Sequence, residues 1–423
     1  MKRNRYAGGM RVLLSLWAAI GVCFGQPASL VLQNGKIVTM SPAAPVAQAI
    51  AMRQDQIIAI GSDSEIRKHI GQGTRTIDLH GMLAIPGFIE GHGHFTGLGE
   101  FRMGLDLREA RTWGEIVSQV ARAARQAKPG EWIIGRGWHQ SKWTQAPDPN
   151  VEGFPLHASL DRVSPDNPVL LTHASGHAAF VNAKAMEAAG ITGKTPNPPG
   201  GEILKDAKGA PTGLLRERAE GLVGRARSEW QARRTPAERM AERRQAIGLA
   251  VDESLSKGIT TFEDAGSPFD TVDLLKSMAE KHELKLRIWM MLRTSNQELA
   301  ARMDRYRILG SGGGFLTVRA IKRAIDGALG SRGAWLLEPY TDKPDSRGLN
   351  TDDPADIRRT AELAIQHGFQ LCVHAIGDRA NRETLNIFEA AFKAHPDKED
   401  LRWRIEHAQH LSAADIPVSA SWA

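Results

Sequence analysis

The sequence has 423 residues, enough for two or three ordinary domains or for one barrel with an accessory domain. Hydrophobic residues make up 42% of it and charged residues 24%, a balance that excludes disordered, collagen-like and low-complexity chains. The formal net charge is +6, but residues 26–423 carry 50 bases against 48 acids. A balance this even gives no reason to expect a nucleic-acid partner.

The first 25 residues have the pattern of a secretory signal peptide. Met1–Arg11 is basic, Val12–Phe24 is a short apolar run, and Cys23–Gly25 offers a small-residue cleavage site. The run is too short to span a membrane comfortably, and an uncleaved N-terminal anchor is the alternative. We therefore expect residues 1–25 to be removed and the chain to be exported, to the periplasm or outside the cell. Cys372 is then the only cysteine, so no intrachain disulfide is expected.

Residues 26–85 are predicted to form a small β-structured unit, because short alternating strands are separated by turn residues such as Asn34-Gly35. Leu83–Ile89 then has the character of a buried strand that leads into His92 and His94. The strands expected in the unit are Leu30–Leu32, Lys36–Met40, Ala49–Met52, Ile57–Ile60 and Thr76–Leu79.

Beyond residue 258 the chain alternates strands with amphipathic helices. This alternation predicts a parallel sheet, either a barrel or a doubly wound sheet. The preceding residues 95–257 are a long mixed region with helical stretches at Thr112–Ala127 and Pro236–Lys257. The strands expected after residue 258 are Ile259–Phe262, Leu284–Leu292, Phe315–Ala324, Gln370–His374 and Trp403–His407.

Four histidines lie at the ends of these predicted strands. His92 and His94 are two residues apart and therefore share one face of a strand, while His374 and His407 each end a later strand. In a βα barrel such ends meet at the mouth where chemistry occurs, and neutral imidazoles are common ligands of divalent metals. An isolated His-x-His pair can be two polar strand-end residues, but recurrence at three strand ends favours a metal site.

Lys322 ends another predicted strand. A protonated lysine cannot bind a metal, because its lone pair is occupied. A buried lysine with a lowered pKa can instead be carboxylated by carbon dioxide, and the two oxygens of the product can bridge two cations. The residue pattern leaves this open against a solvent-facing lysine.

A series of short motifs runs in order from about residue 30 to residue 417. They include Ile85–Ile89 with His92-Gly93-His94, Gly135–Trp138, Ser175–Ala178, Lys322 with Asp326-Gly327, Val373–Asp378, and Ile405–His407. This ordered set resembles the amidohydrolase superfamily, in the branch that contains N-substituted formamide deformylases. The resemblance implies an α/β fold: a distorted TIM barrel with a small N-terminal β-sandwich assembled from both chain ends and a large insertion after barrel strand 1. The implied divisions are 1–25 for the signal peptide, 26–85 for the sandwich, and 86–423 for the barrel with its insertion at 95–257.

The resemblance also implies a metal centre. His92 and His94 would hold one ion, His374 and His407 a second, and carboxylated Lys322 would lie between them. The expected ions are two Zn²⁺, with Fe, Mn or Co as alternatives.

The implied reaction is hydrolysis of a carbon–nitrogen bond, other than a peptide bond, in a small amide-type substrate by a metal-activated hydroxide. Trp138 and His177 in the insertion are candidates for substrate contact, with packing or loop capping as the alternative. A phosphoesterase on an unrelated metal-binding barrel is a further possibility, which the β-unit before His92 disfavours. Neither the substrate nor the oligomeric state is specified.

The sequence ends at Ala423, soon after the histidine of the sixth expected strand. The family continues with two more barrel strands and a general-base aspartate, so about six of eight strands are expected and no catalytic residue is identified. Val418–Ala423 fits a one-base frameshift of the usual family sequence, which suggests an early stop. The alternative function is therefore a truncated, inactive family remnant without the last strands and the base.

Overall fold

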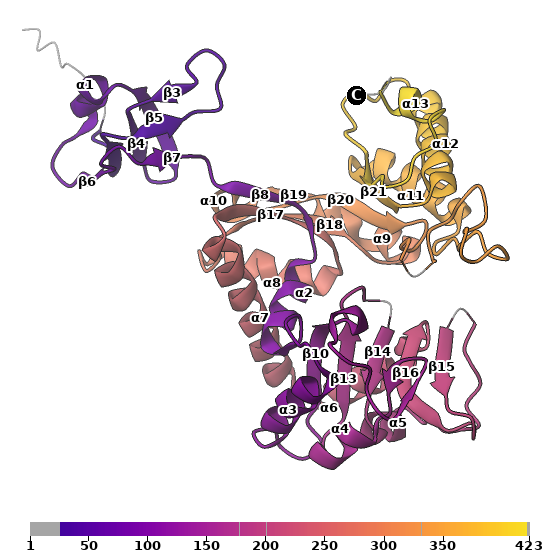
Figure 1. Cartoon of the computed structure of the whole chain (residues 1–423). Coiled ribbons are helices and arrows are strands. Elements are labelled where there is room, and N and C mark those ends of the chain that lie inside the picture. Colours follow the sequence, from indigo (N-terminus) through magenta and orange to yellow (C-terminus); the bar gives the residue numbers. More distant parts are fainter. Residues whose placement is uncertain (1–25, 177, 200, 331, 421–423) are drawn as a thin grey trace, which may run out of the picture. The chain divides into compact units, whose positions relative to one another are not determined.

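The computed structural model describes residues 26–176, 178–199, 201–330 and 332–420 (Figure 1). The chain divides into two compact units, Met1–Gly87 and Phe88–Ala423. The predicted signal peptide lies outside the described residues. Among the residues that are described, no helix has the length and apolar character needed to cross a membrane.

The first unit contains two small sheets. The larger has the order β5-β4-β1-β6, and the smaller has the order β3-β2-β7. A short helix, α1 (Asp63–Ile66), begins with a capping box in which Ser62 and Glu65 satisfy each other's backbone N–H groups. The strands are β1 (Leu30–Gln33), β2 (Lys36–Val38), β3 (Val46–Ala47), β4 (Ala49–Arg53), β5 (Gln56–Gly61), β6 (Arg75–Asp78) and β7 (Leu83–Ala84), so the five strands expected in this unit are present. The expectation of one buried strand at Leu83–Ile89 is wrong, because this segment is divided between β7 and a later strand that begins at Phe88, and Leu83, Phe88 and Ile89 are exposed.

Residues of the insertion form a six-stranded sheet in the second unit, in the order β15-β16-β14-β13-β10-β9. Neighbours are parallel from β9 to β13 and antiparallel from β13 to β15. The sequence pattern predicts helices here, whereas it gives no indication of this sheet. The strands are β9 (Leu105–Asp106), β10 (Ile133–Trp138), β13 (Val169–His173), β14 (Ala178–Val181), β15 (Gly201–Lys205) and β16 (Pro211–Glu217).

The insertion sheet is buried on both faces. On one face Trp138 and Phe180 pack with the helices α3 (Trp113–Ala124) and α4 (Ala158–Val163). On the other face Leu215 and Val181 pack with the helices α5 (Ala183–Ala188) and α6 (Glu220–Arg233). The long helix α7 (Pro236–Ser256) then leads to the barrel, in agreement with the helix predicted there.

Six parallel strands form the barrel sheet, in the order β8-β17-β18-β20-β21-β22. This order follows the sequence, as the strand–helix alternation predicted. The strands are β8 (Phe88–Gly93), β17 (Ile259–Ser267), β18 (Arg287–Leu292), β20 (Leu316–Ala324), β21 (Gln370–Ala375) and β22 (Arg404–His407). The helices α8 (Phe269–Glu280), α11 (Pro354–His367) and α12 (Asp378–Ala394) bury their apolar faces in the same core as the outward-facing strand residues.

The barrel sheet curves until its first and last strands come together. His92 at the end of β8 forms a hydrogen bond with Glu406 of β22, and Arg404 of β22 forms an ion pair with Glu263 of β17. The inner face holds a small cluster that includes Met291 and the free cysteine Cys372. The predicted α/β fold with a barrel of about six strands is therefore confirmed as a nearly closed barrel of parallel strands.

Candidate metal centre

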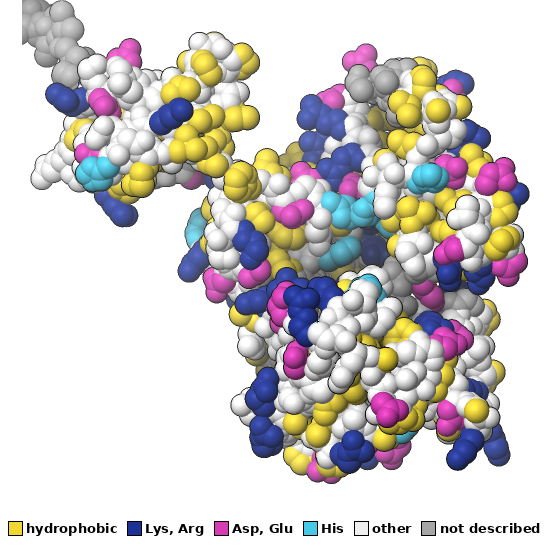
Figure 2. Space-filling model, in the orientation of Figure 1, with side chains coloured by type: hydrophobic (Ala, Val, Ile, Leu, Met, Phe, Trp, Pro, Cys, Tyr) yellow, Lys and Arg dark blue, Asp and Glu magenta, His cyan; other side chains and the backbone are white. Residues whose placement is uncertain are grey.

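The predicted site residues lie at the carboxyl ends of four barrel strands. Lys322 belongs to β20, His374 to β21 and His407 to β22, while His92 lies near the end of β8 and His94 follows that strand. Because neighbouring strands are parallel, these ends meet at one edge of the barrel. Figure 2 shows histidine side chains gathered in one hollow of the second unit.

The four imidazoles form a continuous series. The ring centroids of His92 and His407 are 4.6 Å apart, and those of His374 and His407 are also 4.6 Å apart. The ring of His94 lies 6.1 Å from that of His92. The structure thus brings together all four histidines that the sequence analysis selected.

Local packing fixes the His-Gly-His turn. A side chain at Gly93 would collide with the ring of Phe262, so only glycine fits between the two histidines. His94 occupies the N-cap position of the helix α2 (Phe95–Met103) without a capping bond from its side chain. The first N–H of the helix, that of Phe95, donates instead to the buried carboxylate of Asp264 at 2.8 Å. Asp264 therefore holds the backbone that carries His94.

Lys322 is buried, with 3% of its surface exposed. Burial lowers the pKa of Lys322 to about 8, although the negative charge of Glu406 opposes the shift. A lysine with such a pKa is partly neutral near pH 8, which is the state that reacts with carbon dioxide.

Two of the imidazoles are strongly biased towards the neutral form. Burial, together with the positive charge of Lys322, lowers the pKa of His94 to about 4. Burial also lowers the pKa of His374 to about 4, with a further contribution from His407. The pKa of His407 is lowered as well, again chiefly by burial. Neutral rings keep a lone pair available for a metal ion at pH 7.

Glu406 is a site residue that the sequence analysis did not select. Its carboxylate is 6% exposed, bonds to Nδ1 of His92, and accepts a hydrogen bond from Nε of Arg404 at 2.9 Å. Burial raises the pKa of Glu406, but the bond with His92 and the charge of Arg404 outweigh this effect, and the pKa is lowered overall. The observation that points to Glu406 is the strand register, because Glu406 of β22 is paired with His374 of β21.

The donor chemistry of this cluster can be tested against a metal centre. Within the described parts of the chain, no three His, Cys, Asp or Glu side chains are placed to hold one ion by themselves. Zinc takes about four ligands, so two imidazoles for each ion require further donors. A carbamate on Lys322 would supply one oxygen to each of two ions, and water the rest. The described side chains therefore fit a divalent metal centre only if donors besides His, Cys, Asp and Glu, such as a carbamate on Lys322 or water, complete it.

Of the two candidates for substrate contact, Trp138 and His177, the structure describes only Trp138. Trp138 is fully buried, its Nε1 donates to the carbonyl of Leu171 at 2.7 Å, and its ring stacks on that of Trp143. It therefore occupies the packing role that the sequence analysis left open. His177 lies outside the described residues, so its role stays a prediction.

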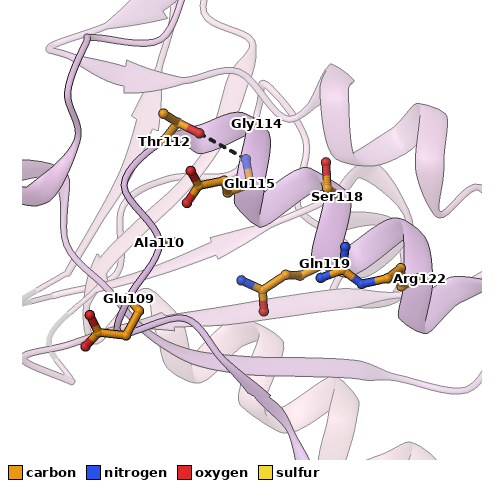
Figure 3. Close-up of a pocket in the computed structure, with 8 residues that line it drawn as sticks. All are labelled: Glu109, Ala110, Thr112, Gly114, Glu115, Ser118, Gln119 and Arg122. Atoms are coloured by element: carbon orange, nitrogen blue, oxygen red, sulfur yellow. Dashed lines mark hydrogen bonds between the residues drawn. The ribbon is translucent and has the colours of Figure 1, made fainter.

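Two surface cavities lie away from the histidine cluster. One, of about 830 Å³, is lined by residues of α2, α6, α7, β10 and β13. The other, of about 560 Å³, lies along the first turns of α3, where Thr112 caps the helix through the N–H of Glu115 (Figure 3). None of the predicted site residues that the structure describes lines either cavity.

Comparison with known proteins places these features in context. The family model described as "Amidohydrolase family" matches residues 75–422. Protein LONG AFTER FAR-RED 3 of Arabidopsis thaliana is 32% identical over 400 residues, which are 92% of this chain and 65% of that protein. The N-substituted formamide deformylase of Arthrobacter pascens is 27% identical over 391 residues, or 90% of this chain and 69% of that protein. This chain thus spans just under two thirds of the plant relative.

A solved structure has the same architecture. The crystal structure of an uncharacterized metal-dependent hydrolase from Pyrococcus furiosus superposes with a TM-score of 0.68 at 25% sequence identity. The superposition covers 93% of this chain and 75% of the archaeal chain.

Proposed function

This chain belongs to the amidohydrolase family, and we propose that it is a hydrolase that cleaves carbon–nitrogen bonds of small amides, other than peptide bonds, with divalent metal ions. The observation that carries the proposal is the convergence of four imidazoles around buried Lys322 at the ends of four parallel strands. The similarity to an N-substituted formamide deformylase supports amide chemistry, and the similarity to a metal-dependent hydrolase supports the metal.

In this proposal His92 and His94 would hold one ion, His374 and His407 would hold a second, and carboxylated Lys322 would supply a further oxygen donor. Such ions polarise the carbonyl of the substrate and lower the pKa of the water that adds to it. Zn²⁺ suits imidazole and carbamate donors, with Fe, Mn or Co as alternatives. To form the carbamate, the neutral amine of Lys322 bonds to the carbon of CO₂ and releases one proton to solvent.

The other side chains prepare the centre. Glu406 binds Nδ1 of His92 and thereby leaves Nε2 of that ring for the metal. Arg404 keeps Glu406 ionised through its Nε hydrogen bond. Burial keeps His94 and His374 neutral at pH 7, so protons do not compete with the ions.

The proposal includes export of the chain and activity of the chain as given. Export through residues 1–25 fits the basic and apolar pattern of that segment. The alternative of an inactive remnant is not favoured by the family match over residues 75–422.

The test uses the full chain, stripped with a chelator and then supplied with two equivalents of Zn²⁺ or Co²⁺. We expect metal-dependent hydrolysis of an N-substituted formamide or another amide in a panel, and no cleavage of a phosphate ester. His407→Ala should abolish this activity, whereas His395→Ala should keep it, because His395 bonds to Glu362 between outer helices. Cleavage of the phosphate ester alone, or amide cleavage that persists without metal, would contradict the proposal.

A further inference from the structure

We propose that Asp326 is a positioning residue of the metal centre, which sets the orientation of the His374 ring by joining the two loops that surround it. The proposal rests on the proposed function, because His374 is one of the four imidazoles. Asp326 lies two residues beyond β20, in a motif that the hydrolytic chemistry above does not use.

Asp326 is a buried carboxylate, 2% exposed, that accepts three backbone hydrogen bonds. Its Oδ1 accepts from the N–H of Ile376 at 3.0 Å, and its Oδ2 accepts from those of Gly377 at 2.8 Å and Trp335 at 2.9 Å. The first two donors belong to the loop after β21, and the third belongs to the loop after β20. One side chain therefore ties together the loops that follow two neighbouring barrel strands.

The same carboxylate lies beside His374. Nε2 of His374 is 3.5 Å from Oδ1 of Asp326, and it donates to the carbonyl of Gly327 at 3.4 Å. Both neighbours of Nε2 are acceptors, so the proton of the neutral ring belongs on Nε2. Nδ1 then keeps its lone pair for a metal ion, as in other imidazole ligands whose second nitrogen is held by an acceptor.

The two loops that Asp326 joins are in close contact. A side chain at Gly377 would collide with the carbonyl of Trp335, and one at Gly327 would come within 3.2 Å of Gly333. Because the loops are in close backbone contact at these glycines, loss of the Asp326 acceptors leaves buried N–H groups without partners. The ring of His374 would then be held by a single long hydrogen bond.

Asp378 offers a matched control. Its Oδ1 accepts from the N–H of Leu337 at 2.8 Å and from that of Arg379 at 2.9 Å, so it also joins the loop after β20 to the segment after β21. Unlike Asp326, it forms neither of the described contacts of the His374 ring. A purely structural role would make the two aspartates equivalent.

The experiment compares the full-length wild type with D326A, D378A and H374A. Zn²⁺ affinity is measured by competition with a chromophoric chelator, and thermal unfolding is followed in parallel. We expect D326A and D378A to lower the Tm by similar amounts. D326A should lower the affinity for one of the two Zn²⁺ ions by about 10- to 100-fold. The Zn²⁺ affinities of D378A should stay within about threefold of those of the wild type. Equal weakening by D326A and D378A, or none in either, would overturn the proposal.

A second measurement needs no metal. Long-range ¹H–¹⁵N spectra of the metal-free protein report the tautomer of His374, with H374A used for assignment. We expect the Nε2–H tautomer in wild type and D378A, and a mixture of tautomers in D326A. An Nδ1–H ring in wild type would overturn the role of Asp326. Equal Zn²⁺ binding by wild type and H374A would instead count against the metal centre itself, so the two failures are distinguishable.

Discussion

The barrel sheet and the insertion sheet of the second unit both carry histidines at strand ends, but the ring nitrogens of the two sets have different partners. In the barrel sheet, His374 ends a strand whose neighbours are parallel, and its ring lies 4.6 Å from that of His407. In the insertion sheet, His173 ends β13, where one neighbouring strand is antiparallel. The ring of His173 lies 4.5 Å from that of His139, which follows the parallel strand β10. Both nitrogens of the His173 ring form hydrogen bonds with side chains, those of Gln140 and Ser175.

Parallel neighbours bring strand-end histidines together in both sheets, so proximity alone does not make a metal centre. In the insertion sheet the ring nitrogens of His173 bond to neighbouring side chains, whereas the barrel histidines surround the buried Lys322. Parallel strands bring every carboxyl end to one edge, whereas antiparallel strands divide their ends between two edges. The interiors of the two sheets also differ in polarity. The barrel holds the charged side chains of Lys322, Arg404 and Glu406, while the core around Trp138 in the insertion sheet consists of aliphatic and aromatic side chains.

The largest effect is expected in the core of the insertion sheet. Trp138→Ala removes a fully buried ring and its hydrogen bond to Leu171, and should lower the free energy of unfolding by about 3–5 kcal/mol. Urea unfolding measures this loss. Zn²⁺ affinity of the folded variant should remain that of wild type; a large loss of affinity would remove the distinction between the two sheets.

Removal of a strand-end histidine should lower Zn²⁺ affinity in the barrel sheet but not in the insertion sheet. His407→Ala deletes an imidazole that contacts two others, so Zn²⁺ affinity should fall by at least about 100-fold, more than loss of an outer hydrogen-bond partner usually costs. His173→Ala is the matched variant in the insertion sheet and should bind Zn²⁺ as wild type does. Comparable losses in both variants would show that the comparison is wrong.

A smaller effect is expected from the carboxylate behind the cluster. Glu406→Gln keeps the shape of the side chain but removes the negative charge next to His92 and Arg404. We expect Zn²⁺ affinity to fall by about tenfold, because outer partners of this kind orient the ligand and raise its basicity. Chelator competition measures the change, and an unchanged affinity would exclude this role for Glu406.

The smallest effect is expected from the corresponding acid–arginine pair in the insertion sheet. Glu202 of β15 pairs with Arg216 of β16 at 2.6 Å, and its side chain is 44% exposed. Glu202→Gln should change the free energy of unfolding by about 1 kcal/mol or less, because exposed ion pairs contribute little. Zn²⁺ affinity should not change; a loss as large as that of Glu406→Gln would argue against a special role for the barrel carboxylate.

Much of the barrel could be predicted from the sequence, because its strands and helices alternate with clear hydrophobic patterns and its histidines stand at strand ends. The insertion sheet was missed for a physical reason. β9 has only two residues, and β10 is interrupted by Gly135 and Gly137, which are poor strand formers. Trp138 drew attention as part of a motif, but sequence alone does not separate a buried core ring from a pocket wall.

The supporting acids were harder to find than the imidazoles. Glu406 faces His92 only because a curved sheet brings the last strand back to the first, and Asp326 acts on backbone N–H groups that carry no side-chain signature. Both effects depend on long-range register, which a single sequence does not specify.

The most direct test of the metal centre is an anomalous-diffraction map of zinc-loaded crystals, collected on both sides of the zinc absorption edge. We expect two strong peaks, one at about 2.0–2.1 Å from ring nitrogens of His92 and His94 and one at the same distance from those of His374 and His407. Zinc found only at other sites, with these four rings free of metal, would contradict it.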